Sequence, residues 1–120
     1  MGCGATNSLD NKKPLAKSFD CMVVNKSDKF LNISCITGSG STIEAQTDSV
    51  MKKLLKELTK HNMKATNVVK LECLLSDLQN FAKFNEIYGA ALDGWKPARL
   101  CVQDNLASGI LVQLNCIATD

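Results

Sequence analysis

Five positions in the second half of the chain carry side chains that could bind or activate a small ligand: Asn85, Arg99, Cys101, Gln113 and Asn115. Arg99 follows Pro97-Ala98 and alternates with Leu100 and Val102, a pattern typical of a β-strand with the arginine on one side. A planar guanidinium on such a rigid base can hold a carboxylate through two parallel hydrogen bonds. The pattern is compatible with a carboxylate anchor, although spacing alone favours the alternative, a surface or intersubunit salt bridge.

The other polar candidates have both functional and structural interpretations. Asn85 falls on the apolar side of an expected helix, where its amide must find partners, either in a loop near a cleft or in a ligand. Gln113 and Asn115 share one side of the expected last strand. Gln113 could orient a water molecule, but an amide cannot accept a proton as a carboxylate does. The structural alternative is that both are polar residues near a subunit interface.

The cysteines do not form a recognisable site. Cys101 lies on the Arg99 side of its strand, but no histidine is placed to activate it as a nucleophile. The chain has no Cys-x-x-Cys pair, and His61, its one histidine, is not spaced as a metal ligand. We therefore expect reduced thiols packed as small hydrophobic side chains, and no structural zinc site.

The elements that must position these residues follow from hydrophobic periodicity. Strands are expected over 20–25 and 29–36, and a helix begins at a capping box formed by Ser41-Thr42-Ile43-Glu44 and ends near 61–62. A strand over 68–75 precedes a second capping box, Ser76-Asp77-Leu78-Gln79. The helix that follows is expected to carry its stripe on Leu78, Phe81, Ala82, Asn85 and Tyr88.

Strands over 98–103 and 109–119 complete the order ββαβαββ, which predicts one α+β domain over residues 18–120. Residues 1–17 are polar and are expected to form a flexible arm. Two helices cannot cover both faces of the sheet, and the last strand is partly apolar on both sides: Val112, Leu114, Cys116 and Ala118 alternate with Leu111, Gln113, Asn115 and Ile117. The uncovered face therefore predicts self-association.

Composition narrows the class of partner. A net charge of +2 and 5% aromatic residues give no reason to expect nucleic-acid binding. The visible basic residues fall mostly on the polar side of the first helix and are interpreted as a solvated surface: Lys52, Lys53, Lys56, Lys60 and Lys64. No apolar run approaches the roughly 18–20 residues of a membrane span. We expect a cytoplasmic protein.

The first six residues contain a possible lipidation signal. Met1-Gly2-Cys3-Gly4-Ala5-Thr6 fits the N-myristoylation pattern, and Cys3 beside Gly2 is a common context for palmitoylation. Two acyl chains hold a protein stably on a membrane, whereas one does not. Membrane association is thus expected only if Gly2 and Cys3 are modified; the alternative is an unmodified polar tail.

Taken together, several segments resemble the RidA (YjgF, L-PSP) family of reactive-intermediate deaminases over roughly residues 18–119. The resemblance consists of an "EAQ" helix start, a "VVK…DL..FA" run, "N..Y", "PAR" and a closing "IA", found here at Glu44-Ala45-Gln46, Val68-Val69-Lys70, Asp77-Leu78, Phe81-Ala82, Asn85, Tyr88, Pro97-Ala98-Arg99 and Ile117-Ala118. The resemblance implies a chorismate-mutase-like fold in a trimeric barrel with three clefts between subunits.

The resemblance also implies a chemistry. Members hydrolyse 2-imino or enamine acids to 2-keto acids and ammonia, without a cofactor. In them the arginine that matches Arg99 binds the substrate carboxylate, and main-chain groups around the position of Cys101 help to hold the reacting end. Two positions depart from the active pattern: Gln113 stands where active members carry a water-activating glutamate, and Ile33 stands in place of the serine of an "SGQ" motif, read here as Ile33-Ser34-Cys35. A tyrosine expected near Asp20 is absent.

Three functions follow from the sequence. The first is a RidA-type deaminase in which Arg99 and Gln113 act on the substrate, and Asn85, Cys101 and Ile33 line its site. The second is a trimer that binds small carboxylates without turnover, since the glutamate and serine are missing. The third is an endoribonuclease, an older family label; the chain offers neither an evident acid–base pair nor a strongly basic groove for it.

Overall fold

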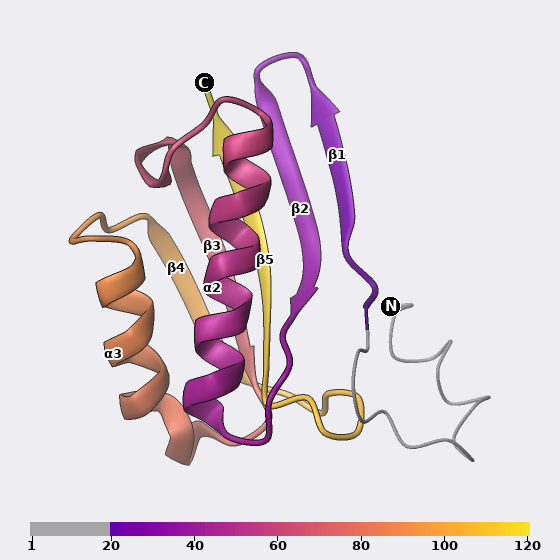
Figure 1. The fold of residues 1–120 in the computed structure, drawn as a ribbon, viewed down its shortest axis with the longest axis vertical. Helices are drawn as coiled ribbons and strands as arrows, with labels where there is room; N and C mark the ends of the chain where they lie inside the picture. The colour runs from indigo at the N-terminus through magenta and orange to yellow at the C-terminus, as the bar shows by residue number, and fades with distance from the viewer. Residues whose placement is uncertain (1–19) are drawn as a thin grey trace.

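The computed structural model describes residues 20–120, and the predicted order ββαβαββ is confirmed over this range. Five strands form one sheet with two helices against it, an α+β architecture (Figure 1). The elements are β1 (Val23–Ser27), β2 (Phe30–Thr37), α2 (Ile43–Lys60), β3 (Val68–Leu75), α3 (Phe81–Ala91), β4 (Ala98–Gln103) and β5 (Val112–Thr119), with short 3₁₀ turns η2 (Ala65–Asn67) and η3 (Leu78–Asn80). The predicted arm over 1–17, with Gly2 and Cys3, lies outside the described residues.

The sheet order is β1-β2-β5-β3-β4, so the last strand of the chain lies at the centre. β5 is antiparallel to both of its neighbours, whereas β3 and β4 are parallel. A parallel pair needs a crossover connection, and α3 supplies it. As a consequence β4 is an edge strand that lies beside α3.

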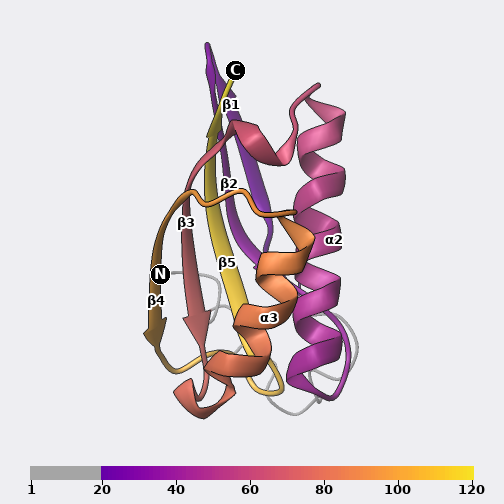
Figure 2. The same cartoon turned by 90° about the vertical axis from the view of Figure 1, so that its left-hand side faces the viewer.

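Both helices cover the same face of the sheet, and the other face is bare (Figure 2). We call the bare side the open face; the side chains on it include Asn32, Ser34, Lys70, Glu72, Leu100, Gln113, Asn115 and Ile117. Along β5 the residues alternate between buried and half-buried, with Val112 and Leu114 toward the helices, as the sequence pattern predicts. No helix within the described part of the chain is long and apolar enough to span a membrane.

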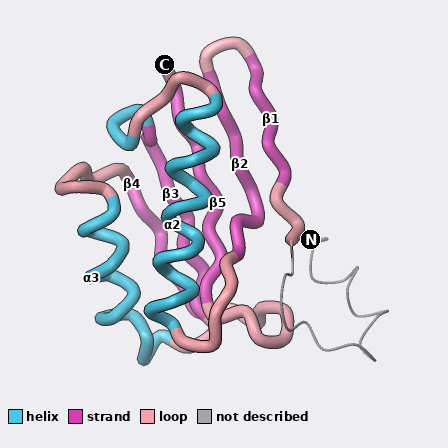
Figure 3. The backbone as a smooth tube through the Cα atoms, in the orientation of Figure 1, coloured by secondary structure: helices cyan, strands magenta, loops and turns pink. Residues whose placement is uncertain are grey.

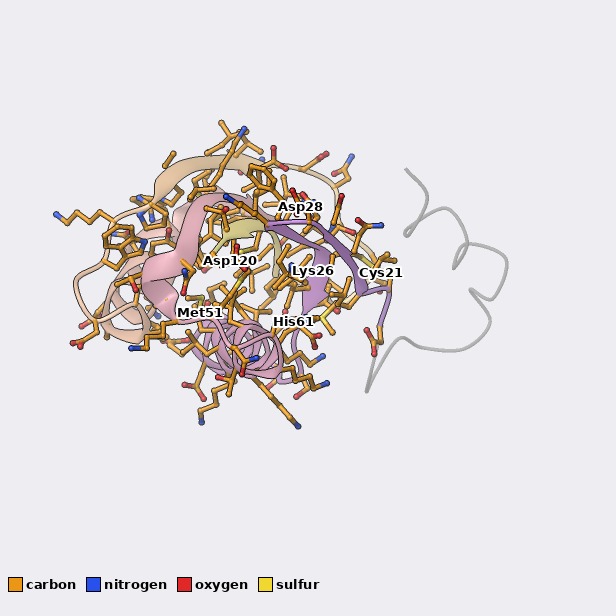
Figure 4. All side chains as sticks on the ribbon, turned by 90° about the horizontal axis from the view of Figure 1, so that it is seen from above. Cys21, Lys26, Asp28, Met51, His61 and Asp120 are labelled. Atoms are coloured by element: carbon orange, nitrogen blue, oxygen red, sulfur yellow. A yellow bond between two sulfur atoms is a disulfide. The ribbon has the colours of Figure 1, made fainter. Side chains whose placement is uncertain are left out.

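Helix α2 packs an apolar side on the sheet through residues such as Met51, Leu54 and Leu58. Viewed from above, side chains with charged ends project from the side of the helix that faces away from the sheet (Figure 4). The helix begins one residue later than the predicted capping box implies. Thr42 is the N-cap, and its hydroxyl accepts a hydrogen bond from the Ala45 N–H at 3.1 Å, so Glu44 takes no part in a reciprocal pair.

The second helix also starts differently from the prediction. Asp77 caps only the η3 turn, by accepting a hydrogen bond from the Gln79 N–H at 2.9 Å, and α3 begins at Phe81. Its buried residues are Phe84 and Tyr88, whereas Leu78 and Phe81 of the predicted stripe are exposed. The 3₁₀ turn rotates the helix relative to a continuous α-helical pattern, because it has 3.0 rather than 3.6 residues per turn.

A buried amide that the sequence did not reveal joins two loops at one end of the molecule. Gln46 in α2 is 2% exposed and donates from Nε2 to the carbonyls of Gly40 and Gly109, at 2.9 and 2.7 Å. Its Oε1 accepts the Leu111 N–H at 2.8 Å. The loop before α2 and the loop after β4 lie at this same end (Figure 3). The buried amide thus satisfies its own hydrogen-bonding groups by bonding the main chain of both loops.

Strand β2 contains a bulge that also carries a disulfide. The register with β5 shifts between Ile33 and Ile36, and Cys35 adopts a positive φ of 62°. Cys21, which lies just before β1 (Figure 4), is joined to Cys35, with their Cα atoms 5.6 Å apart. The expectation of reduced thiols is therefore wrong for this pair, because the pairing of β1 with β2 brings the two residues side by side. Cys73, Cys101 and Cys116 are free thiols, as expected.

Candidate functional site

Arg99 lies between the edge strand β4 and helix α3, held by partners on that helix. Its Nη1 donates to Oδ1 of Asn85 at 2.6 Å. The guanidinium carbon lies 4.8 Å from the ring centre of Tyr88 and 5.5 Å from that of Phe81. Aromatic faces attract a cation through their quadrupole, and the hydrogen bond fixes the plane of the fork. Two candidates found separately in the sequence, Arg99 and Asn85, are thus in direct contact.

Strand register explains why Arg99 points to the helix side. Leu71 of β3 pairs with Arg99 and Cys73 pairs with Cys101, and both β3 residues belong to the core under the helices. Arg99 and Cys101 therefore share that face of the sheet. Because β4 is the edge strand, α3 covers it incompletely and Arg99 stays exposed.

A cavity of about 340 Å³ opens beside Arg99, which we call the arginine cavity. Its lining consists of Asn85, Tyr88, Gly89, Gly94, Trp95, Lys96, Pro97 and Arg99. Trp95 is held in place because its Nε1 donates to the Val68 carbonyl at 3.0 Å. Lys96 adds a second cation to the rim. This volume and charge suit a small organic anion.

Tyr88 is the buried floor of the arginine cavity. It is 6% exposed, and its hydroxyl has no hydrogen-bond partner among the described residues. Burial raises the pKa of Tyr88 to about 12, against a smaller lowering by Arg99. The phenol therefore stays protonated at neutral pH and can donate a hydrogen bond, but it cannot act as a base.

Three free thiols lie on the covered face of the sheet, on β3, β4 and β5. Burial raises the pKa of Cys73 and of Cys116 to about 12, and it also raises the pKa of Cys101, which Arg99 partly opposes. A thiol must ionise to act as a nucleophile, so these residues are packing groups at neutral pH. Within residues 20–120, no three cysteine, histidine or acidic side chains are grouped so as to hold a metal ion.

A second cavity, of about 240 Å³, lies on the other side of the sheet, and we call it the open-face cavity. Its lining comprises Asn32, Ile33, Ser34, Lys70, Glu72, Asn115, Cys116 and Ile117. Asn115 donates from Nδ2 to Oε1 of Glu72 at 3.1 Å and accepts the Cys35 N–H on Oδ1 at 2.8 Å. A chain of hydrogen bonds thus joins three strands, from the β2 bulge through β5 to β3.

The structure does not bring all the predicted site residues together within one chain. Gln113 is half-buried on the open face, and the sheet separates it from Arg99. Ile33 borders the open-face cavity, but it is 1% exposed and its side chain packs in the core. A ligand there can meet the main chain of Ile33 but not its side chain.

The bulge favours a different match to the Ser-Gly-Gln motif. The residue with a positive φ in the bulge is Cys35, and glycine is the residue type that adopts this conformation without strain. Ser34-Cys35-Ile36 therefore fits the motif better than Ile33-Ser34-Cys35. In that register the serine is retained as Ser34, which lines the open-face cavity. This correction needed the backbone angles, because the sequence alone does not locate a bulge.

Three residues of these cavities were not predicted as site residues. Lys96 follows Trp95 in a loop, and hydrophobic periodicity does not predict the path of a loop. Tyr88 appeared as a position of the helix stripe and of the "N..Y" motif, without a role in the site. Glu72 was placed beside Lys70 on one side of its strand, but its contact with Asn115 depends on the pairing of β3 with β5. That non-local pairing has no signal in the sequence.

Comparison with known proteins gives a consistent answer. The profile of the family Endoribonuclease L-PSP matches residues 33–120. A RutC family protein of Pyrococcus abyssi is 35% identical over 89 residues, which cover 63% of this chain and 70% of that protein. Across the first curated relatives, the match spans 59% to 70% of their own length.

Solved structures agree in fold. The crystal structure of an L-PSP-type protein from Entamoeba histolytica matches this chain with a TM-score of 0.79 and 34% sequence identity. The match covers 89% of this chain and 92% of that chain. RidA from a Psychrobacter species has a TM-score of 0.77 and 27% identity, with 81% and 85% covered. Sequence and fold together show that this chain belongs to the RidA (YjgF, L-PSP) family.

Proposed function

We propose that this protein is a RidA-type deaminase, which hydrolyses 2-imino acids to 2-keto acids and ammonia in the cytoplasm. The observation that carries the proposal is the placement of Arg99. Its guanidinium is fixed by Asn85 and Tyr88 at the rim of the arginine cavity, yet it remains exposed. A pre-oriented fork of this kind loses little conformational freedom when it takes a carboxylate.

The catalytic assembly we propose is a homotrimer with a site between neighbouring copies. The open face carries exposed apolar side chains, including Val23, Phe30 and Leu100, which a monomer would leave in water. Arg99 and Gln113 lie on opposite faces of their own sheet. A site that uses both must therefore take Arg99 from one protomer and Gln113 from another.

The proposed reaction makes modest demands on the protein. The carbon of a protonated imine is already electrophilic, so binding its carboxylate and directing a water molecule at that carbon can suffice. Arg99 would anchor the carboxylate, and Gln113 would orient the water. Neither a metal ion nor an organic cofactor takes part in the proposed steps.

The test is ammonia release from freshly generated 2-iminobutanoate, measured with the purified protein. Loss of a charge-assisted bidentate contact predicts that Arg99→Ala lowers kcat/KM by about 100-fold or more. Arg99→Lys keeps the charge but not the fork, so partial activity is expected. Lys52→Ala is the matched control, because Lys52 is an exposed cation on α2 that pairs with Asp48. Full activity in Arg99→Ala would contradict the proposal.

A second candidate is a trimer that binds small 2-keto acids without turnover. Gln113 favours it, because an amide cannot take the proton of water. Calorimetry with 2-oxobutanoate would then show binding that Arg99→Ala abolishes, while no ammonia is released from the imine. If turnover does occur and Gln113 directs the water, Gln113→Glu should raise the rate.

An endoribonuclease activity ranks third. The net charge of +2 provides little attraction for a polyanion, so we expect no RNA cleavage by the purified trimer. Cleavage that a single substitution in either cavity removed would contradict this ranking. Membrane association is proposed only for protein acylated at Gly2 and Cys3, and the intact mass of the native protein would test it.

A further inference from the structure

We propose that Glu72, oriented by Asn115, is the general base that takes the proton from the attacking water. This inference rests on the proposed deaminase function and adds a catalytic residue to it. The water-directing role given to Gln113 leaves the proton without an acceptor. Among the described residues that line the open-face cavity, Glu72 supplies the carboxylate.

The hydrogen bonds around Asn115 fix the direction of the Glu72 carboxylate. The Cys35 N–H donates to Oδ1 of Asn115 at 2.8 Å, and this contact determines which way the amide is turned. The amide nitrogen must then face Glu72, and it donates to Oε1 at 3.1 Å. The second carboxylate oxygen, Oε2, has no such short contact and lies 3.8 Å from Nζ of Lys70. One oxygen is thus held, and the other remains available to a water molecule.

Glu72 also lies on the same face as Gln113. In the pairing of β3 with β5, Glu72 is opposite Asn115 and Leu74 is opposite Gln113. Glu72 and Gln113 are therefore diagonal neighbours, and such positions have Cα atoms about 7–8 Å apart. Two long polar side chains can meet at one water molecule across that distance. On the other side, Leu100 of β4 lies opposite Glu72 and brings no charge.

A purely structural role for Glu72 explains less. Its ion pair with Lys70 is long, and the two side chains are 40% and 48% exposed, respectively. Exposed pairs of this kind contribute little to stability. A pairing role with Lys70 would also not require an amide locked onto the other oxygen. The arrangement around Asn115 resembles the way in which a catalytic base is oriented by a neighbouring group.

The proposed step balances as follows. A water oxygen forms a bond to the iminium carbon, the π electrons of the C=N bond move to nitrogen, and one water proton passes to Glu72. The product is a neutral carbinolamine. Glu72 returns that proton to the nitrogen, the C–N bond breaks to release ammonia, and the hydroxyl oxygen forms the ketone. The hydroxyl proton leaves through Glu72 to ammonia, so the net products are a 2-keto acid and ammonium.

The experiment compares Glu72→Gln, Glu72→Ala and a matched control, Asp48→Asn, an exposed carboxylate on α2. Loss of a general base predicts that Glu72→Gln lowers kcat for 2-iminobutanoate by about 100-fold or more, with KM nearly unchanged. Added formate should restore turnover in Glu72→Ala, which a merely structural role would not produce. Asp48→Asn should behave as the wild type.

Two further measurements separate the possible failures. Binding of 2-oxobutanoate should stay within twofold of the wild type in Glu72→Gln, since Arg99 is intact, and Asn115→Ala should show a smaller loss of kcat. Turnover that depends on Arg99 but persists in Glu72→Gln would overturn the role of Glu72 alone. A wild-type protein that releases no ammonia would overturn the proposed function, and this inference with it.

Discussion

The two faces of the sheet differ in how their polar groups are arranged. On the covered face, the polar and titratable groups of the described residues pack against their own neighbours and do not form a chain of hydrogen bonds across the strands. Arg99, for example, contacts two residues of one adjacent helix, Asn85 and Tyr88. On the open face, a chain of hydrogen bonds from Cys35 through Asn115 to Glu72 crosses three strands. The covered face thus depends on local packing, and the open face depends on strand register. The predictions below test this difference.

The largest expected effect on stability comes from Gln46, a buried amide that bonds three main-chain groups. Gln46→Leu removes three hydrogen bonds and leaves the carbonyls of Gly40 and Gly109 and the Leu111 N–H without their partner. Since each intramolecular hydrogen bond contributes about 1 kcal/mol net, we expect a loss of about 3 kcal/mol. Urea unfolding measures it.

Gln79→Leu is a suitable control, because Gln79 is an exposed residue of the η3 turn. It should change the free energy of unfolding by less than about 0.5 kcal/mol. If Gln46→Leu were equally mild, the two loops would be held by contacts other than this amide.

The next prediction concerns the buried thiols of the covered face. Burial raises the pKa of Cys116 from 9.0 to about 12 in the folded protein. Below pH 9 the thiol is protonated in both states, so the full stability is present. As the pH rises toward 12, the unfolded chain loses this proton first, and stability falls by about 1.4 kcal/mol per pH unit for one such group.

Cys116→Ala removes that titration. Relative to pH 8, the variant should lose about 2 kcal/mol less stability at pH 10.5 than the wild type does. The stability lost because alanine is smaller than cysteine is the same at both pH values, so it cancels in the comparison. Equal losses in both proteins would mean that the Cys116 thiol reaches water in the folded state.

Features that depend on neighbours in the chain could be predicted from the sequence, whereas features that depend on strand pairing could not. Periodicity located the strands and helices, the alternation along β5 and the alternation of Arg99 with Leu100, because each depends on neighbours in the chain. It did not show that Gln113 and Arg99 lie on opposite faces. That relation depends on how β3, β4 and β5 pair, which is a non-local property.

Local departures from regular geometry account for most of the remaining errors. The η3 turn rotated α3, so Phe84 rather than Phe81 is buried. The β2 bulge displaced the match to the Ser-Gly-Gln motif by one residue. Gln46 was part of a motif in the sequence, but its three partners come from loops separated from it by up to 65 positions. Such contacts require a tertiary structure.

A test of the open face uses the strained residue of the bulge. In a Cys21→Ser background, which removes the disulfide, Cys35→Gly should be more stable than Cys35→Ala by about 1 kcal/mol, because a side chain at positive φ costs about 1–2 kcal/mol. Ser34, the preceding residue, is the matched control. There glycine should be less stable than alanine, as expected in an ordinary strand.

The two pairs of variants separate strain from general flexibility. If glycine were unfavourable at both positions, the positive φ of Cys35 would not be maintained in solution. The Cys35 N–H would then have no fixed direction toward Asn115. Urea unfolding and the kcat of the deaminase reaction should change together if that contact orients Glu72.

The smallest expected effect concerns Tyr88, on the covered face. Its buried hydroxyl has no partner among the described residues, so Tyr88→Phe should stabilise the protein by about 1 kcal/mol. The aromatic ring under Arg99 is retained, and carboxylate binding should be unchanged. Tyr88→Leu removes the ring as well, so it should weaken binding of 2-oxobutanoate by releasing the guanidinium. A loss of stability in Tyr88→Phe would show that the hydroxyl is hydrogen-bonded in solution, and the covered face would then contain a polar network like that of the open face.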